Sequence, residues 1–583
     1  MRKIFKKTIC SLLAVTTAAV ALAGCNPYDD DEVEIDETKT QLYVYNYNGG
    51  YGSKWLDNVK NRFETQFAGY EGENGKVGVQ VIVENGKRLG TAYLEVIATD
   101  RNEVIFTESI YYYDFVSRGL LCDMGDAVTT PLTEYNETVS IMDKLSVEQQ
   151  NFYKSGDSVY AVPFRSNVQG ITYDMDLFAE GEFYFAKGGA PSEYCEYTQN
   201  NNESPASGSF DGDPTNYMDY TFTDGTDANN MSAGPDGKYG TTDDGLPATY
   251  DEFFIMCDKM VDNETTPMIW TGQYATNYLN HFMDQLIADY EGLEQFNMYY
   301  SFDGTAKHLV DTDALNATGE VSYLPAQTIT PGKEGNGYLM SQSAGRYYAL
   351  QFFERLIKNK DYYDAKSFNQ TESHLGAQSD FLYSKWESRN IAMLMEGIWW
   401  ENEAETAFSE LSVHDGSSKL ERNFGLMYLP KATEAQIGET STYADILNSL
   451  CMINGNIKEE KKELARQFVR FCFTEESNRA WNVDTGTPRA MEYTLLESDW
   501  AQISTFGKRI YNITQENPIG YTYANTTFYK ENAKTVAVAA TVGFNNPGGA
   551  GFANAFKNHA DTATAIKIFV DSKDYLKDTG AWS

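Results

Sequence analysis

The segment from Gly234 to Gly245 gathers carboxylates and glycines in a pattern that could hold a hard cation. Calcium needs clustered carboxylate and carbonyl oxygens, and glycines let the backbone wrap around the ion. Asp236, Asp243 and Asp244 would supply the carboxylates, and a backbone oxygen near Lys238 would complete the set. The alternative is a solvated acidic turn, because like charges repel one another and stay in water. The segment therefore predicts either a structural calcium site or a solvated turn. We expect no cofactor that the protein requires.

Catalytic groups are harder to find in this chain. Among 84 acidic residues some pair always looks suited to glycoside hydrolysis, and Glu401, Glu403 and Glu405 are one such group. No Ser-His-Asp set, phosphate-binding loop or dinucleotide-binding glycine motif stands out. The cysteines form no Cys-x-x-Cys pair, so a zinc site is not expected. The sequence predicts a protein that is not an enzyme, with a secreted glycan-degrading hydrolase as the alternative.

Aromatic and acidic side chains dominate the composition. The chain of 583 residues contains 41 Tyr, 32 Phe and 8 Trp, and aromatic faces of this kind can stack on the apolar faces of sugar rings. The formal charge of −38 argues against a nucleic-acid partner, because phosphates bind to an excess of Lys and Arg. The same charge disfavours anionic ligands in general and favours neutral glycans. The length predicts more than one domain.

A strand, a helix and two further strands follow one another near the start of the body of the protein. Residues 41–47 show a strand pattern, and a helix with an apolar residue at every fourth position follows a glycine-rich turn. Residues 77–83 and 104–106 predict two more strands, so the order indicates a parallel sheet in an α/β fold. Ligands bind at the carboxyl ends of such strands, which places residues 47–51 and 107–114 at a candidate cleft.

The first 24 residues are typical of a signal peptide. Basic residues precede an apolar stretch from Ile9 to Ala23, which is too short to span a bilayer. The ending Leu22-Ala-Gly-Cys25 resembles the lipobox of bacterial lipoproteins, which implies cleavage before Cys25 and attachment of lipid to its sulfur. The alternative is an ordinary signal peptide with a chance cysteine. Residues 25–40 are rich in acids and predict a solvated tether that holds the body away from the outer face of a bacterial cell membrane.

Six segments follow one another in a fixed order, at residues 160–178, 249–254, 390–400, 424–430, 459–476 and 486–489. Together they resemble segments of the extracellular solute-binding proteins that serve ABC importers, specifically the maltose-binding-protein-like carbohydrate group (family 1). The segment from Tyr160 to Phe178 resembles a strand that crosses the hinge of these proteins. Thr249-Tyr-Asp-Glu-Phe-Phe254 resembles the start of one of their helices, and Thr249 with Glu252 has capping-box spacing. The other matching segments are Asn390–Trp400, Phe424–Pro430, Glu459–Glu476 and Gly486–Arg489.

The resemblance implies an α/β, two-lobed, periplasmic-binding-protein-like fold with a ligand cleft between the lobes and hinge crossovers. Residues 196–247 would be a polar acidic insertion within lobe two, since no Ile, Leu or Val occurs from 196 to 245. The hinges would lie near Val162-Pro163 and Pro430-Lys431, where proline keeps the backbone extended. The expected boundaries are 41–161 plus 438–490 for lobe one, and 165–430 plus 491–583 for lobe two.

The function implied by the resemblance is that of a membrane-anchored receptor. It would capture a sugar or oligosaccharide outside the cell and deliver it to an ABC transporter permease. We expect a monomer that performs no covalent chemistry. A cell-surface glycan-binding lipoprotein that works without a transporter is the alternative, since its sequence could look the same.

The candidate ligand-binding residues follow from their positions in the family. They combine aromatic faces with amide and charged groups, as sugar binding requires. Of the adjacent Trp399 and Trp400, one should face the cleft and the other the core, because neighbours on a helix do not share a face. Core packing is the alternative for each aromatic residue. The candidates are Tyr47, Tyr51, Asp114, Arg165, Asn167, Trp270, Tyr274, Glu396, Trp399 and Trp400.

Overall fold

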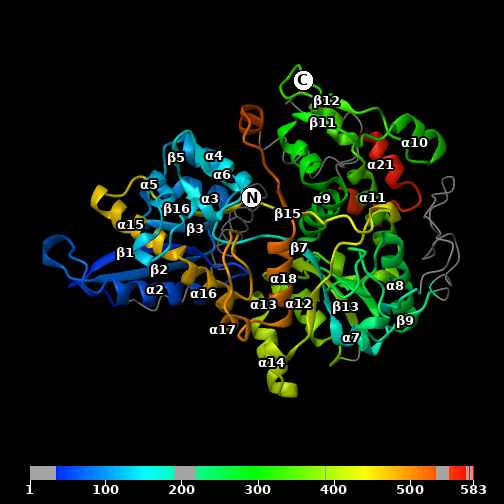
Figure 1. The fold of residues 1–583 in the computed structure, drawn as a ribbon, viewed down its shortest axis with the longest axis horizontal. Coiled ribbons are helices and arrows are strands. Elements are labelled where there is room, and N and C mark those ends of the chain that lie inside the picture. Colours follow the sequence, from blue (N-terminus) through cyan, green and yellow to red (C-terminus); the bar gives the residue numbers. More distant parts are fainter. Residues whose placement is uncertain are drawn as a thin grey trace, which may run out of the picture.

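The computed structural model describes residues 34–188, 217, 220–387, 389–532, 551–572, 577 and 582. Within these residues the chain forms two α/β lobes side by side, each built on its own sheet (Figure 1). The prediction of a two-lobed α/β fold is therefore confirmed. The predicted signal peptide, Cys25, most of the tether and much of the polar insertion lie outside the described residues.

Lobe one is built on a five-stranded sheet whose strands come from distant parts of the chain. β1 runs parallel to β2 and β3, whereas β16 runs antiparallel to β3 and β6. The carboxyl ends of β1, β2 and β3 therefore meet at one edge, where the cleft is predicted. The order of the strands is β2 (Val79–Gly86), β1 (Thr40–Tyr47), β3 (Val104–Glu108), β16 (Ser449–Ile453) and β6 (Ala161–Val162).

Helix α2 (Lys54–Gln66) illustrates how lobe one is held together. Its apolar residues Trp55, Val59 and Phe63 recur every four positions, so that they share one buried face. This face packs on α15 (Glu459–Cys472) and α16 (Glu475–Thr485), and the rings of Trp55 and Trp481 lie 4.7 Å apart. The other helices of this lobe are α3 (Gly90–Val96), α4 (Tyr112–Ser117), α5 (Gly125–Thr129) and α6 (Val147–Tyr153).

Lobe two is built on a four-stranded sheet with β13 at its centre. All seven residues of β13 are buried, as expected for a strand that is covered on both faces. The strand order is β10 (Thr266–Ile269), β13 (Ile391–Gly397), β7 (Gln169–Asp174) and β14 (Phe424–Leu426). The helices are α7 (Met175–Glu180), α8 (Tyr250–Asp262), α9 (Ala275–Ser301), α10 (Thr312–Thr318), α11 (Ala344–Lys358), α12 (His374–Tyr383), α13 (Trp400–Glu403), α14 (Glu405–Asp415), α18 (Thr505–Glu516), α20 (Phe552–Asn558) and α21 (Ala565–Asp571). Across the described ranges, no helix combines the length and the apolar character needed to cross a bilayer.

The return of the chain to lobe one differs from the prediction. Lys431 is buried in lobe two, where its ammonium lies 2.8 Å from the Asp289 carboxylate of α9. Strand β15 (Tyr443–Asp445) is also fastened to lobe two, because Ala444 exchanges two hydrogen bonds with Gln285 of α9. The chain therefore crosses between β15 and β16, which corrects the predicted hinge at Pro430-Lys431 and the predicted boundary at residue 438.

The C-terminal part of the chain contacts both lobes. Helix α18 packs on β14, and α20 and α21 pack on α11 in lobe two. Strand β17 (Ile519–Tyr521) pairs with β15 between the lobes. Beyond it, the ring of Tyr523 lies 4.5 Å from that of Phe152 in lobe one, whereas Tyr529 lies 6.3 Å from Tyr300 in lobe two. This segment, predicted in lobe two, thus bridges the lobes.

Replacing Lys431 with methionine should destabilise the protein by about 3 kcal/mol, because Asp289 would stay buried without its cation. Chemical denaturation of the full chain, followed by circular dichroism, measures this effect. The double variant Lys431→Met with Asp289→Asn should regain most of the loss. Equal destabilisation of the single and double variants would contradict the pairing.

Candidate ligand-binding site between the lobes

The turn that follows β1 meets lobe two, and we call the region where the two lobes meet the gap. Tyr47 ends β1, and its half-buried ring lies 5.9 Å from the ammonium of Lys87. Tyr51 is buried, and its hydroxyl donates to the carbonyl oxygen of Ser166 at the chain crossing. Burial raises the pKa of Tyr47, and the negative charge of Glu403 in lobe two adds to this rise.

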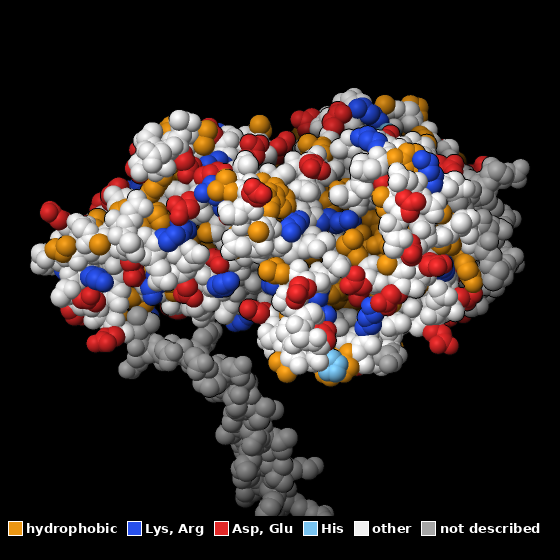
Figure 2. All heavy atoms as spheres, turned by 60° about the horizontal axis from the view of Figure 1, so that its bottom comes forward, with side chains coloured by type: hydrophobic (Ala, Val, Ile, Leu, Met, Phe, Trp, Pro, Cys, Tyr) orange, Lys and Arg blue, Asp and Glu red, His pale blue; other side chains and the backbone are white. Residues whose placement is uncertain are grey.

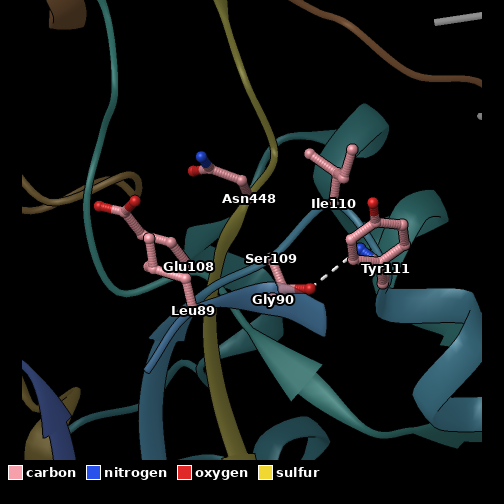
Figure 3. Close-up of a pocket in the computed structure, with 7 residues that line it drawn as sticks. All are labelled: Leu89, Gly90, Glu108, Ser109, Ile110, Tyr111 and Asn448. Atoms are coloured by element: carbon pink, nitrogen blue, oxygen red, sulfur yellow. Dashed lines mark hydrogen bonds between the residues drawn. The ribbon is translucent and has the colours of Figure 1, made fainter. Parts of the chain in front are cut away.

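A shallow pocket of about 280 Å³ opens at the same edge, where β2 and β3 end (Figure 3). The backbone N–H of Tyr111 donates to the hydroxyl oxygen of Ser109 at 3.0 Å, which fixes the loop after β3. Glu108 connects the pocket to the gap, because its carboxylate pairs with Arg165. The lining residues are Leu89, Gly90, Glu108, Ser109, Ile110, Tyr111 and Asn448.

Arg165 and Asn167 lie where the chain crosses between the lobes. The guanidinium of Arg165 is buried 4.5 Å from the ring centroid of Tyr51. Asp445 accepts hydrogen bonds from the Ser166 hydroxyl at 2.8 Å and from the Asn167 backbone N–H at 2.9 Å. Burial raises the pKa of Asp445 to about 6. These contacts tie two crossings of the chain together, and a ligand-binding role for Arg165 and Asn167 stays a prediction.

Lobe two touches lobe one through Trp399 and Asn402. The side-chain amide of Asn402 donates to the carbonyl oxygen of Gly50 at 2.8 Å. Trp399 covers the same glycine, since a Cβ atom at Gly50 would stand 2.3 Å from Cδ1 of the indole. The rings of Tyr51 and Trp399 lie 5.9 Å apart. Trp399 thus faces the gap, as expected for one member of the tryptophan pair.

Two predicted aromatic contacts belong to the core of lobe two. Trp400 is fully buried among four phenylalanine rings. Trp270 is also fully buried, because it follows β10 into the core, where it packs on Tyr363 and Phe368. The predicted ligand contacts of Trp400 and Trp270 are therefore corrected. Asp114 lies in the first turn of α4 and does not line the pocket, whereas Tyr111 does.

A network of acids and an amide lies behind Trp399. Glu396 is the last residue but one of β13. It is almost fully buried, at 1% exposure, and receives a hydrogen bond from Tyr278. The side-chain amide nitrogen of Gln378 lies 3.4 Å from Glu396 and 2.8 Å from Glu403. Burial raises the pKa of Glu396 to about 8, and the charge of Glu403 contributes, so Glu396 is mostly protonated at neutral pH.

His374 connects this network to the gap. Its Nε2 atom lies 3.3 Å from Oε1 of Glu403, and this hydrogen bond raises the pKa of His374. The positive charge of Lys87 in lobe one opposes the rise. Tyr274 is 43% exposed, and its ring lies 5.9 Å from that of His374. Tyr274, His374 and Glu403 thus form one connected group in lobe two.

Charges of both signs are mixed on the surface and paired in the gap. The face shown in Figure 2 carries acidic and basic side chains interspersed, without a continuous basic patch. In the gap, Arg165 pairs with Glu108, and His374 pairs with Glu403. Each of these two carboxylates therefore has a basic side chain beside it.

Sequence analysis missed the polar groups that meet in the gap. Lys87, His374 and Gln378 belong to no recognised motif, and Glu403 attracted notice only as one of several clustered acids. The only local signal was the placement of residues 107–114 at the cleft, which includes Glu108 of the pocket. The other groups meet only through the tertiary fold.

The loop predicted to bind calcium is closed by its own hydrogen bonds. Asp243 accepts from the backbone N–H of Asp236 at 2.9 Å, and Asp244 accepts from that of Gly240 at 2.7 Å. Asp236 accepts from the backbone N–H of Lys238 at 2.7 Å. Among the residues that the structure describes, no three His, Cys, Asp or Glu side chains are grouped so as to hold a metal ion. Calcium at this loop stays a prediction that the geometry does not support.

Comparison with known proteins identifies the fold class. No protein-family model and no curated protein matches the chain. A solved structure described as "SBP RafE in complex with raffinose" is similar, with a TM-score of 0.52 and 15% identity over 94% of this chain and 100% of that chain. The apo form of RafE from Streptococcus pneumoniae has a TM-score of 0.48 and 15% identity over 91% of this chain and 100% of that chain. The first of these two likenesses, together with the two separate sheets, shows that the chain has a two-lobed fold of the kind found in that solute-binding protein.

Replacing Gly50 with alanine should hold the lobes further apart, because the new methyl group would collide with the Trp399 ring. Small-angle X-ray scattering should then give a larger radius of gyration than for the wild type. Gly69→Ala is a matched control in the same lobe, since a methyl group there meets open space. Identical scattering of the Gly50→Ala variant and the wild type would contradict the contact.

Replacing Glu396 with glutamine should flatten part of the pH dependence of stability. The pKa of Glu396 is 4.5 in its unperturbed form and about 8 in the fold, so the folded state holds the extra proton between these values. The contribution of Glu396 to the free energy of unfolding therefore falls as pH rises from about 5 to 8. The glutamine variant should not show this fall. The measurement is the melting temperature of the wild type and of the variant at pH 5, 6.5 and 8. Parallel curves of melting temperature against pH would contradict the raised pKa of Glu396.

Proposed function

We propose that this protein is a receptor that captures a sugar or oligosaccharide between its lobes and leaves it chemically unchanged. One observation carries the proposal: aromatic faces and paired polar groups from both lobes line one gap. The Tyr51 ring of lobe one lies 5.9 Å from the Trp399 ring of lobe two, Tyr47 ends β1 beside Lys87, and the exposed Tyr274 lies beside His374. Such rings stack on the apolar faces of a sugar, and neighbouring charged and amide groups bind its hydroxyls.

The acid pair in the gap favours binding over hydrolysis. The side-chain amide of Gln378 donates to the carboxylates of both Glu396 and Glu403. The two carboxylates are therefore close enough together to resemble the acid pair of a glycoside hydrolase. Hydrolysis requires that both carboxylates reach the glycosidic bond. Glu396 is enclosed by its neighbours at 1% exposure, so a sugar in the gap has access to Glu403 alone.

The ligand would act by favouring the closed arrangement of the lobes. Closure brings Trp399 and Asn402 onto Gly50, and a ligand that touches both lobes binds this form better than an open one. The pocket beside Glu108 continues the gap along lobe one, which supports a ligand of more than one sugar unit.

Delivery of the sugar to an ABC transporter permease extends this proposal. The solute-binding fold supports this role. The lipobox-like ending at Cys25 and the acidic tether favour a protein anchored by lipid to the outer face of a bacterial membrane, and we expect it to be a monomer. A glycan-binding lipoprotein without a transporter would bind the same sugars. Loss of sugar uptake by cells that lack the protein would distinguish the transport role from simple surface binding.

A thermal-shift screen of residues 26–583 against neutral oligosaccharides, raffinose among them, tests the central proposal. At a concentration one hundred times the dissociation constant, a bound sugar should add about 2.7 kcal/mol of stability. That corresponds to a rise of several degrees in melting temperature for a chain of this size. The sugar should be recovered intact, and recovery of shortened sugar would indicate a hydrolase instead.

Replacing Trp399 with alanine should abolish the shift, because the ring is the aromatic face that lobe two brings against lobe one. Trp386→Ala is the matched control, since Trp386 is equally large but lies 50% exposed against His414, with ring centroids 4.0 Å apart. An unchanged shift in the Trp399→Ala variant would place the sugar elsewhere. The absence of a shift with every sugar would contradict carbohydrate binding.

A further inference from the structure

The carboxylate of Glu403 is fixed from two sides. Gln378 donates to Oε2 at 2.8 Å, and Nε2 of His374 lies 3.3 Å from Oε1. His374 and Gln378 are four residues apart in α12, so a single helix face presents both. Gln378 is fully buried, which prevents it from turning away into water. Glu403 therefore has little freedom to change its orientation.

Part of the Glu403 side chain remains exposed. Its side chain is 16% exposed, whereas the neighbouring Glu396 is sealed off. An ionised carboxylate offers about four acceptor positions on its two oxygens, and the two contacts from α12 leave the others for a ligand. Its charge acts on Tyr47, Tyr51 and Arg165, which all belong to the opposite side of the gap or to the chain crossing. The residue before it, Asn402, donates to the carbonyl oxygen of Gly50 in lobe one, so Glu403 lies beside the contact between the lobes.

A carboxylate held in this way selects its ligand by chemistry. It accepts hydrogen bonds and cannot donate them, so it favours hydroxyl groups and disfavours carboxylates and phosphates. Two hydroxyls on adjacent carbons of a sugar ring can each donate to one oxygen of the same carboxylate, and such charge-assisted bonds are strong.

We propose that Glu403, positioned by His374 and Gln378, determines ligand specificity by accepting two adjacent hydroxyls of a neutral sugar. This inference rests on the proposed function, because it names the group that recognises the sugar in the same gap. It extends that function from sugars in general to sugars whose neighbouring hydroxyls are free at the ring beside Trp399. His374 and Gln378 are positioning residues, since they act through Glu403.

The test measures the dissociation constant by calorimetry for the neutral oligosaccharide that gives the largest thermal shift, starting with raffinose. Glu403→Gln should weaken binding about 10- to 100-fold, because a charge-assisted acceptor is lost. Glu405→Gln is the matched control, since Glu405 is exposed at the start of α14 and faces water. Its affinity should equal that of the wild type.

A methylated form of the same sugar separates recognition from a general loss of fold. Methyl groups on the two adjacent hydroxyls should weaken binding to the wild type, but should cost the Glu403→Gln variant little further affinity. The positioning role is tested at His374. His374→Leu should weaken binding about threefold to tenfold, whereas His374→Gln keeps a donor and should retain most of the affinity.

The outcomes distinguish this inference from the proposed function. If no sugar binds the wild type, the proposed function fails and the inference fails with it. If sugars bind and Trp399→Ala abolishes binding, while Glu403→Gln keeps wild-type affinity, the inference alone is overturned. Additive losses for methylation and for Glu403→Gln would also overturn it.

Discussion

The contact between Trp399 of lobe two and Gly50 of lobe one is the constraint on which the site depends. Only the absence of a side chain at residue 50 lets the indole come this close, and the same approach brings Asn402 within hydrogen-bonding distance of the Gly50 carbonyl. The contact sets how near the polar groups of the two lobes come to each other. The charge of Glu403 contributes to the raised pKa of Tyr47, and the charge of Lys87 opposes the raised pKa of His374, so the electrostatics of the two lobes are coupled here.

Burial divides the acids of the gap into those that hold the fold and those that can meet a ligand. Asp445 and Glu396 are buried, hydrogen-bonded and shifted to higher pKa, so they serve to tie chain segments together. Glu403 remains partly exposed and is held by neighbours that are themselves fixed. This division is why the gap suits recognition of hydroxyl groups better than acid–base chemistry, which needs two accessible carboxylates.

The sequence predicted the architecture better than it predicted the site. Periodicity and strand order were sufficient for the parallel part of lobe one, because α2 buries residues at regular spacing and β1 to β3 follow one another closely. Trp270 and Trp400 were placed at the ligand by family position, yet both complete the core of lobe two, since large aromatic side chains serve packing and binding equally well. The segment around Lys431 was placed at a hinge because of its proline, whereas the buried pair with Asp289 fixes it in lobe two. His374 and Glu403 come from different elements, so their pairing follows from the packing of α12 on the end of β13 and not from any local pattern.

The most direct test of this account is a crystal structure of the protein with the neutral oligosaccharide that stabilises it most. The account predicts a sugar ring between Tyr47 and Trp399, with two adjacent hydroxyls on Glu403 and with the lobes closed over it. A sugar bound on the outer surface of either lobe, or a cleaved sugar in the gap beside an exposed Glu396, would contradict it.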